Sequence, residues 1–354
     1  MRGEAAEYLQ RVGKPSRVAT SRYRSRSRGS RHTGRMRLVG RTRTVQHRIE
    51  PVLGTRMDVS ITASSRRGSD AVLRDVLAEI DRLEKVFSIF DPNSELSRWK
   101  HADEQNCEVS KDLADLLQRG AEWHGRTAGL FNPNLGGIRE LWKHAEKTAQ
   151  EPNRVELKNA LEVAAALPYE LNGRQVRKIA SCAGLDFNAI AKGLIVDRAV
   201  AAAWDQQRPE MLLLNLGGDL RHRGTGSVTV KVEDPADRSA AALTEIVVSN
   251  AAVATSGTSW RGFTIGDQSF GHVLDPRTGR PTNSMATATA TVVSADAATA
   301  DVVATALTVL DIDEGSALAE SLGPLFIDYF LLSPDRRTRH STTWPRQQTA
   351  SKGS

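Results

Sequence analysis

The sequence reads His272-Val-Leu-Asp-Pro-Arg-Thr-Gly279 and, a little later, Asp296-Ala-Ala-Thr-Ala-Asp-Val-Val-Ala-Thr305. The first stretch predicts a strand that ends in a rigid turn, because Pro276 fixes its own φ angle and removes a backbone donor. The second predicts a helix of small residues on which Asp301 and Thr305, four positions apart, share a face. Such hard oxygen ligands, with alanines leaving room around them, suit a divalent cation such as Mg2+. The pair also fits a solvated helix face or a packing device.

Residues 185–197 predict a strand end that leads into a second helix. Asn188 is the predicted N-cap, and Asp186 and Lys192 place opposite charges near the helix start. Backbone N–H groups at a helix start favour anions. The segment therefore suits a phosphate group, although an ordinary surface lysine explains Lys192 equally well.

Two more segments place small and hydroxyl-bearing residues where a strand ends. The apolar stretch 211–216 runs into Gly217-Gly218-Asp219, and Val253-Ala-Thr-Ser-Gly257 combines two hydroxyls with a glycine. Glycines at a strand end allow the backbone to approach a ligand closely, and they also occur in plain turns. Together with His272, these segments indicate an enzyme that handles phosphate groups.

In their order and spacing these segments resemble the ApbE family, the FAD:protein FMN transferases. The resemblance runs from about Val52 to about Leu310. The family's motifs appear here, in order, as Leu53-Gly54-Thr55, Phe87-Ser-Ile-Phe-Asp-Pro-Asn-Ser-Glu-Leu-Ser97, Phe131-Asn-Pro-Asn134 with Leu141-Trp142, Asp186-Phe-Asn-Ala-Ile-Ala-Lys-Gly193, Gly217-Gly218-Asp219, Thr255-Ser256-Gly257, His272 to Gly279 and Ala300-Asp-Val-Val-Ala-Thr305.

Three positions depart from the family's usual residues. Leu53 stands where the family has Met, which is a mild change between apolar side chains of similar volume. Phe90 stands where it often has Tyr, so a ring for stacking remains but a hydroxyl donor is lost. Asn132 replaces the usual Asp and removes a negative charge near the presumed FAD site.

The resemblance implies a metal-dependent reaction in which FMN moves from FAD to a Ser or Thr hydroxyl of an acceptor protein, with release of AMP. The chain shows no acceptor segment of the family's substrate type, so the acceptor is expected to be another protein. Two other functions stay open. One is a Mg2+-dependent FAD pyrophosphatase that yields FMN and AMP, and the other is a non-catalytic FAD-binding protein.

The resemblance also implies roles for individual residues. His272 is the expected base, and Asp275 either orients it, binds ribose or simply holds the turn. Mg2+ is expected at Asp301 and Thr305, with further contacts at Ala189, through the carbonyl of a loop, and at Ala304. The implied FAD-binding residues are Leu53, Phe90, Leu130, Phe131, Asn132, Asp186, Lys192, Gly217, Gly218, Thr255, Ser256, Gly257 and Asp275.

Helical and hairpin patterns alternate without regular βαβ spacing, which predicts an α+β fold with largely antiparallel sheets and packed helices. The expected helices span residues 69–90, 110–124, 143–165, 189–204 and 296–310. The expected strands are a pair within 46–61, a hairpin around Asn172-Gly173, residues 211–216, 227–233, 243–249, 261–265, 269–274 and 286–293, and a last pair within 325–332.

The net charge of +6 comes from the N-terminal segment. Residues 1–50 carry 14 Lys and Arg against three Asp and Glu, so the rest of the chain is net acidic. Residues 1–45 are predicted to be a disordered basic tail, residues 46–333 the folded domain and residues 334–354 a polar C-terminal tail. The tail could contact nucleic acid or be a passive extension; no nucleic-acid partner is expected for the core.

Cysteine and apolar content exclude several classes of protein. Cys107 and Cys182 form no CxxC pair, which argues against a disulfide framework or a zinc site. No apolar run of 18 residues occurs, so no membrane span is predicted. An apolar leader and a lipid-anchor cysteine are also missing from the N-terminal segment, so either the protein is cytoplasmic, which is the expectation, or the start of the sequence is wrongly assigned.

Overall fold

The computed structural model describes residues 42–344, apart from 238, 258–261, 283–285, 324, 325 and 327. Residues 1–41 of the predicted basic tail lie outside this range. The last positions of that predicted tail belong to the first strand, which begins at Arg43. Among the described residues, no helix is long and apolar enough to cross a membrane.

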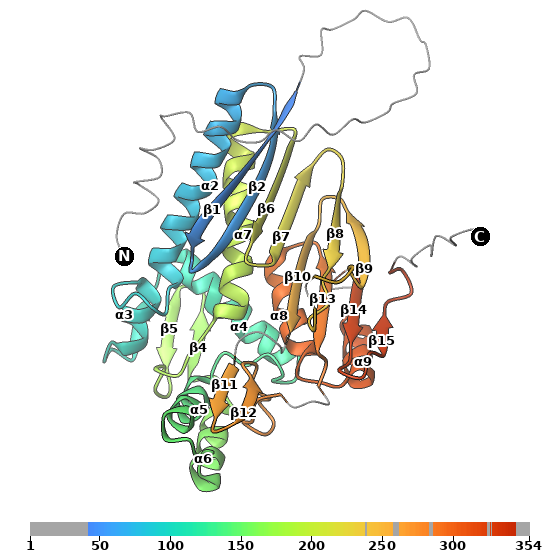
Figure 1. Cartoon of the computed structure of the whole chain (residues 1–354). Coiled ribbons are helices and arrows are strands. Elements are labelled where there is room, and N and C mark those ends of the chain that lie inside the picture. Colours follow the sequence, from blue (N-terminus) through green and yellow to red (C-terminus); the bar gives the residue numbers. More distant parts are fainter. Residues whose placement is uncertain are drawn as a thin grey trace, which may run out of the picture. The chain divides into compact units, whose positions relative to one another are not determined.

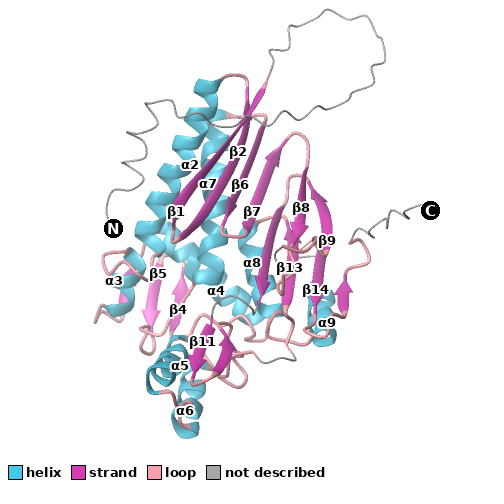
Figure 2. Ribbon diagram, in the orientation of Figure 1, coloured by secondary structure: helices cyan, strands magenta, loops and turns pink. Residues whose placement is uncertain are grey.

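One eight-stranded sheet forms the centre of the body that begins at Arg43 (Figures 1 and 2). Each strand in it is antiparallel to its neighbours, which confirms the predicted α+β fold with antiparallel sheet. Its strand order is β1 (Arg43–Val52), β2 (Thr55–Ala63), β6 (Met211–Leu216), β7 (Asp219–Gly224), β10 (Ala252–Gly257), β13 (Thr289–Ser294), β14 (Asp328–Leu332) and β15 (Thr338–His340).

Helices cover one face of this sheet. Their apolar residues recur at helical spacing, and α8 is buried almost all round because alanine and valine supply most of its surface. Ser65 caps α2, so that helix begins before the predicted residue 69 and ends at Phe87. The helices are α2 (Arg66–Phe87), α7 (Asn188–Gln207), α8 (Ala297–Leu307) and α9 (Ile312–Leu322).

The hairpin of β8 (Val228–Val232) and β9 (Thr244–Val248) covers part of the opposite face. Its apolar side chains join Leu220, Val253 and Phe330 in one buried cluster, which also includes Trp344. Residues 334–344, predicted to be a polar tail, therefore contribute both an edge strand, β15, and a core tryptophan. The packed body extends beyond the predicted boundary at residue 333.

The remaining elements gather below one end of the sheet in Figure 1. They are α3 (Glu95–His101), β3 (Asn106–Glu108), α4 (Lys111–Arg126), α5 (Gly136–Thr148), α6 (Arg154–Ala164), β4 (Tyr169–Asn172), β5 (Gln175–Lys178), β11 (Gly262–Ile265) and β12 (Gln268–Gly271). Ser110 caps α4 at the start of the helix predicted over 110–124, and the β4–β5 hairpin turns at Gly173 as predicted. A core of α5, α6 and β11 side chains, centred on Trp142, holds part of this group together.

Three predicted elements differ from the structure. The helix expected over 143–165 is two helices, α5 and α6, because Ala149 turns into the left-handed region at φ 53° and Pro152 follows it. The strand expected over 269–274 ends at Gly271, so His272 lies in a loop. Of the pair expected within 325–332, residues 328–332 form the strand β14, which pairs with β15, while residues 325 and 327 lie outside the described residues.

Candidate active site at one end of the central sheet

Two tight turns lie side by side at one end of the sheet. The Leu53-Gly54 turn joins β1 to β2, and the Gly217-Gly218 turn joins the next two strands, β6 and β7. The Gly217 N–H donates to the Arg56 carbonyl at 2.9 Å, so the two turns are in direct contact. Two motifs that are more than 150 residues apart in the sequence therefore meet here.

Both turns depend on positive φ angles. Leu53 adopts φ 49° and Gly54 φ 70°, and the left-handed region costs a non-glycine residue roughly 1–2 kcal/mol. Gly217 adopts φ 62°, and a Cβ added there would lie 2.7 Å from the Thr55 hydroxyl. Only glycine fits at 217, whereas Leu53 holds a strained backbone, a feature that concentrates at functional sites.

The end of β10 reaches the same place. β10 runs antiparallel to β7 with Val253 opposite Leu220. Residues 255–257 therefore extend past Asp219, the first residue of β7. The Gly-Gly-Asp and Thr-Ser-Gly motifs are thus neighbours across one pair of strands.

A buried lysine–carboxylate cluster lies where α7, β7 and α8 meet. Lys192 Nζ is 2.7 Å from Asp219 Oδ2 and 3.6 Å from Asp301 Oδ2. Both carboxylates are almost fully buried, Lys192 faces both of them, and the Asp301 carboxyl group also interacts with that of Asp219. One ammonium group thus faces two carboxylates. With both carboxylates ionised the cluster has a net negative charge, which favours the binding of a further cation.

Burial sets the ionisation of this cluster. It raises the pKa of the Asp301 carboxyl well above its usual range, and the charge of Asp219 raises that pKa further, while Lys192 lowers it. Burial alone would lower the pKa of Lys192, but the two carboxylates outweigh burial and raise it. Lys192 therefore stays charged at neutral pH. Perturbed groups of this kind concentrate at functional sites.

Asp219 was not predicted as a site residue, although Gly217 and Gly218 before it were. The two glycines shape the turn, and the side chain that reaches Lys192 is that of Asp219. The signal in the sequence was an acidic residue directly after a Gly-Gly strand end. A carboxylate at that position is buried at the cluster instead of solvated, since β7 begins there.

Thr305 lies one helical turn beyond Asp301 and meets β10. Its hydroxyl is 3.2 Å from the Ser256 hydroxyl, so the predicted carboxylate–hydroxyl face of α8 points toward α7 and β10. Thr255 instead bonds the Thr291 hydroxyl at 2.9 Å. Successive strand residues face opposite sides of a sheet, so of these two predicted FAD contacts only Ser256 faces α8.

The start of α7 differs from its predicted cap. Phe187, not Asn188, occupies the N-cap position, and Asn188 is the first helical residue. The Asp186 carboxylate accepts the Asn188 N–H at 2.9 Å. The side chain that accepts a backbone N–H group at this helix start is therefore that of Asp186, two residues before Asn188. Asn188 itself is exposed.

The two alanines predicted as metal contacts both lie inside helices. Ala189 is the second residue of α7, so its carbonyl does not belong to a loop as expected. Ala304 is fully buried in α8, and its carbonyl accepts the Thr308 N–H at 3.3 Å. Ala189 is half-buried and is the more accessible of the two.

α7 also fixes α8 beside it. Asp197 accepts the backbone N–H groups of Ala297 and Ala298 at 2.8 and 3.0 Å. Burial raises the pKa of Asp197 to about 6, against the lowering effect of these two hydrogen bonds. A Cβ added at Gly193 would lie 2.5 Å from the Ala297 carbonyl oxygen. This close packing sets the distance between Lys192 and Asp301.

His272 lies half-buried in the loop that follows β12. Its carbonyl accepts a hydrogen bond from Arg139 Nη1 at 3.4 Å, and Arg139 Nε is 3.8 Å from Asp186 Oδ2. Two residues predicted for the site are thus linked through an arginine of α5 that the sequence patterns did not indicate.

Asp275 closes the turn after His272. Its carboxylate accepts the Arg277 N–H at 2.8 Å and pairs with the Arg277 guanidinium at 2.9 Å. Its own N–H donates to the Arg280 carbonyl at 2.8 Å. Of the three predicted roles for Asp275, these contacts support holding the turn.

The Phe131-Asn-Pro-Asn134 motif shapes the backbone next to α5 and α6. Phe131 is buried and Leu130 half-buried. The Asn132 amide donates to the Ala164 carbonyl at 2.9 Å, and its oxygen accepts the Asn134 N–H at 2.7 Å. An aspartate could make only the second bond, so the asparagine at 132 fits this chain's contact with the end of α6.

We therefore expect Asn132→Asp to destabilise the protein by about 1–3 kcal/mol, because a carboxylate would face a carbonyl oxygen with no donor between them. Chemical denaturation of both proteins measures this change, and FAD titration serves as the control. Tighter FAD binding at unchanged stability would show that residue 132 contacts the ligand instead.

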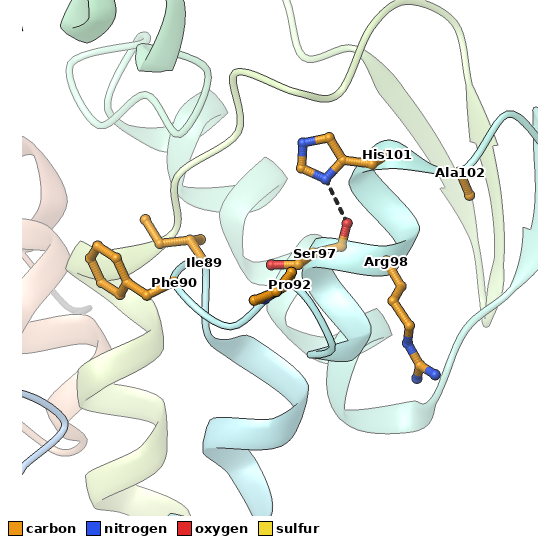
Figure 3. A pocket seen from close by; sticks show the side chains of 7 residues that line it. All are labelled: Ile89, Phe90, Pro92, Ser97, Arg98, His101 and Ala102. Atoms are coloured by element: carbon orange, nitrogen blue, oxygen red, sulfur yellow. Dashed lines mark hydrogen bonds between the residues drawn. The ribbon is translucent and has the colours of Figure 1, made fainter. Parts of the chain in front are cut away.

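Phe90 is an exposed aromatic side chain next to a surface cavity of about 480 Å3. Phe90 is 83% exposed, and Figure 3 shows it on the opposite side of the cavity from His101. The His101 ring makes a hydrogen bond of 2.8 Å to the Ser97 carbonyl. An exposed ring of this kind is free to stack on a planar ligand. The cavity is lined by Ile89, Phe90, Pro92, Ser97, Arg98, His101 and Ala102.

No cluster of three or more His, Cys, Asp or Glu side chains suited to a metal occurs within the described ranges of the chain. The acidic ligands available at the site are Asp219 and Asp301, with the hydroxyls of Ser256 and Thr305 beside them.

Comparison with known proteins places the chain in a family. A model of the ApbE family matches residues 53–326. An FAD:protein FMN transferase of Rhodobacter capsulatus is 31% identical over 225 residues, which cover 62% of this chain but only 42% of that protein. One from Vibrio cholerae is 27% identical over 286 residues, covering 78% and 84% of the two chains.

Solved structures agree with this result. The ApbE protein of Thermotoga maritima is 25% identical, with a TM-score of 0.74 over 85% of this chain and 98% of its own. The flavinyl transferase ApbE of Pseudomonas stutzeri, 22% identical, shares the fold with a TM-score of 0.70 over 85% and 95% of the two chains. The family model spans most of the folded body, and several of the motifs meet at one end of the sheet, so this chain belongs to the ApbE family.

Proposed function

We propose that this protein is an FAD:protein FMN transferase that moves FMN from FAD to a Ser or Thr hydroxyl of another protein and releases AMP. The observation that carries the proposal is the cluster of Lys192 with the buried carboxylates of Asp219 and Asp301, in which three of the family's motifs meet. Relatives that bear this activity by name align over most of the chain.

The reaction exchanges the phosphoanhydride bond between the two halves of FAD for a phosphoester bond to the acceptor. The acceptor hydroxyl oxygen attacks the phosphorus of the FMN half of FAD, and the bond from that phosphorus to the oxygen bridging the AMP half breaks. AMP leaves with the electron pair of that bond, and the hydroxyl proton passes to a base, which we assign to His272. Such phosphoryl transfer depends mainly on positioning and on neutralising charge.

Residues of this chain can position the FAD and neutralise its phosphate charge. The Lys192 ammonium offsets phosphate charge close to Asp301. The Gly217-Gly218 turn, with no side chains, lets the pyrophosphate approach the backbone. Phe90 offers its exposed ring to a planar ring of FAD, and Ser256 and Thr305 supply hydroxyls between β10 and α8.

The cluster also fits Mg2+. Mg2+ commonly binds one or two carboxylates and completes its shell with water and substrate phosphate oxygens. Asp219 and Asp301 bring two buried carboxylates together beside the single ammonium group of Lys192, and Thr305 and the Ala189 carbonyl are the neutral ligands that we assign. When bound, the cation would stabilise the negative charge that develops on the phosphates.

Incubation with FAD, Mg2+ and a panel of candidate acceptor proteins tests the proposal. In-gel flavin fluorescence reports labelled acceptor, and a coupled assay reports AMP. Labelled acceptor with an equal amount of AMP supports the transferase. AMP with free FMN and no labelled protein would identify a pyrophosphatase, and FAD binding without AMP would identify a flavin-binding protein.

Phe90→Ala should weaken FAD binding by about 1–3 kcal/mol, the usual value of one aromatic stacking contact. The melting temperature should not change, since the ring is exposed. Fluorescence titration with FAD measures the affinity, and Phe90→Tyr, which keeps a ring, serves as the matched control. Equal affinity of the wild type and the alanine variant would exclude Phe90 from the FAD site.

A further inference from the structure

We infer that Arg139 is a positioning residue that fixes the backbone of His272 against the segment leading into α7. The inference rests on the proposed function only in giving His272 a part in proton transfer. Arg139 lies in the first turn of α5, where the sequence alone gives it the appearance of an ordinary surface arginine.

The Arg139 guanidinium lies between the two segments. Nη1 donates to the His272 carbonyl at 3.4 Å, and Nε is 3.8 Å from the Asp186 carboxylate. The side chains of Arg139 and Asp186 are 32% and 21% exposed, so both are partly shielded from water. One side chain thus connects the loop after β12 with the start of α7.

α5 holds the His272 loop at both ends. Trp142 Nε1 donates to the Gly279 carbonyl at 2.7 Å, while Arg139 holds the His272 carbonyl. Arg139 and Trp142 are three residues apart and share one face of the helix. Between these two contacts, Leu274 is buried in the same cluster as Trp142. The loop from His272 to Gly279 therefore packs along α5.

The start of α5 is in turn joined to the segment before α7. The Gly136 N–H donates to the Gly184 carbonyl at 2.8 Å, and the Asp186 N–H donates to the Pro133 carbonyl at 2.7 Å. A Cβ at Gly136 would lie 2.3 Å from the Gly184 oxygen, so this contact is tight. The start of α5, from which the Arg139 side chain extends, is therefore held in place relative to α7 and Lys192.

The two anchors of the loop differ in kind. Trp142 is fully buried and belongs to the core, whereas Arg139 is partly exposed and its Nε makes no hydrogen bond. Loss of Arg139 should therefore shift His272 without unfolding the domain. A misplacement of about 1 Å can cost about 10²-fold in rate, so a modest shift is enough to be measured.

A double-mutant cycle tests this inference. Arg139→Gln should lower the single-turnover transfer rate at saturating FAD by about 10–100-fold, with the FAD dissociation constant unchanged and partial recovery in Arg139→Lys. In the His272→Gln background the same change should have no further effect. Equal effects in both backgrounds, or weaker FAD binding with a normal saturated rate, would overturn the inference.

A control variant and an independent readout complete the experiment. Arg119→Gln removes an arginine of similar exposure that pairs with Asp115 on α4, and its transfer rate should equal that of the wild type. Hydrogen exchange of the amides in residues 268–279 should be faster in Arg139→Gln. This readout needs no transfer activity: if the wild type labels no acceptor, the proposed function fails, whereas unchanged exchange refutes the role of Arg139.

Discussion

Asp301→Asn is expected to lower AMP release from FAD by at least about 10²–10³-fold, the usual cost of losing one group that stabilises developing charge. The substitution keeps the shape of the side chain and removes its charge. Only Asp219 would then remain as an acidic ligand at the cluster, facing the Lys192 ammonium at 2.7 Å. A one-to-one ion pair has little attraction left for a divalent cation.

The same substitution should not destabilise the protein when EDTA is present. Asp219 and Asp301 share the single ammonium of Lys192, and burial together with Asp219 raises the pKa of Asp301 in the folded state. The folded protein therefore binds a proton here more readily than the unfolded chain. Wild-type stability should rise as pH falls through the raised pKa, and should lose this contribution as pH rises through the same window.

Melting curves from pH 4 to pH 8 in EDTA, with AMP assays in Mg2+, measure both effects. Asp301→Asn should gain less stability on acidification than the wild type, and the gain from Asp197, whose pKa burial raises to about 6, should remain in both proteins. The matched control is Asp234→Asn, which breaks a pair with Arg336 at 2.7 Å and should lower stability without changing AMP release, since neither residue belongs to the cluster. Near-normal turnover in Asp301→Asn at low Mg2+ would refute the assignment.

Sequence patterns predicted those parts of the site that depend on local chemistry. The four-residue spacing of Asp301 and Thr305 requires only a helix to place both on one side, and the structure shows that helix. The Gly217-Gly218 turn likewise needs only its own backbone conformation. These features lie within one or two elements, so a short stretch of sequence specifies them.

Contacts between distant segments could not be predicted in the same way. Asn132 has a structural partner, Ala164, 32 residues away, and Arg139 meets the His272 carbonyl 133 residues away. From the sequence alone, Asn132 is interpreted as a ligand contact and Arg139 as a surface arginine. Their actual partners become visible only in the folded structure. The break between α5 and α6 was missed because helix propensity outweighed the signal of a single proline, Pro152.

His272→Gln is expected to lower the transfer rate by roughly 10²–10⁴-fold, the usual contribution of general acid–base catalysis. Glutamine keeps a polar side chain of similar reach but cannot take up and release a proton near neutral pH. The loop backbone is held through the His272 carbonyl and the Gly279 carbonyl, and these contacts do not involve the replaced side chain. The fold and the FAD affinity should therefore be preserved.

Single-turnover rates at saturating FAD, measured across pH for both proteins, separate the possible roles of His272. An imidazole base gives a transfer rate that falls on the acidic side of neutrality, and the variant should lose that limb of the profile along with most of its rate. His144→Gln, on the exposed side of α5, is the matched control and should behave as the wild type. If FAD affinity collapses while the saturated rate stays normal, His272 binds substrate. The base would then have to be another residue. Asp275 is the nearest carboxylate in the sequence, but its pair with Arg277 in closing the turn argues against it.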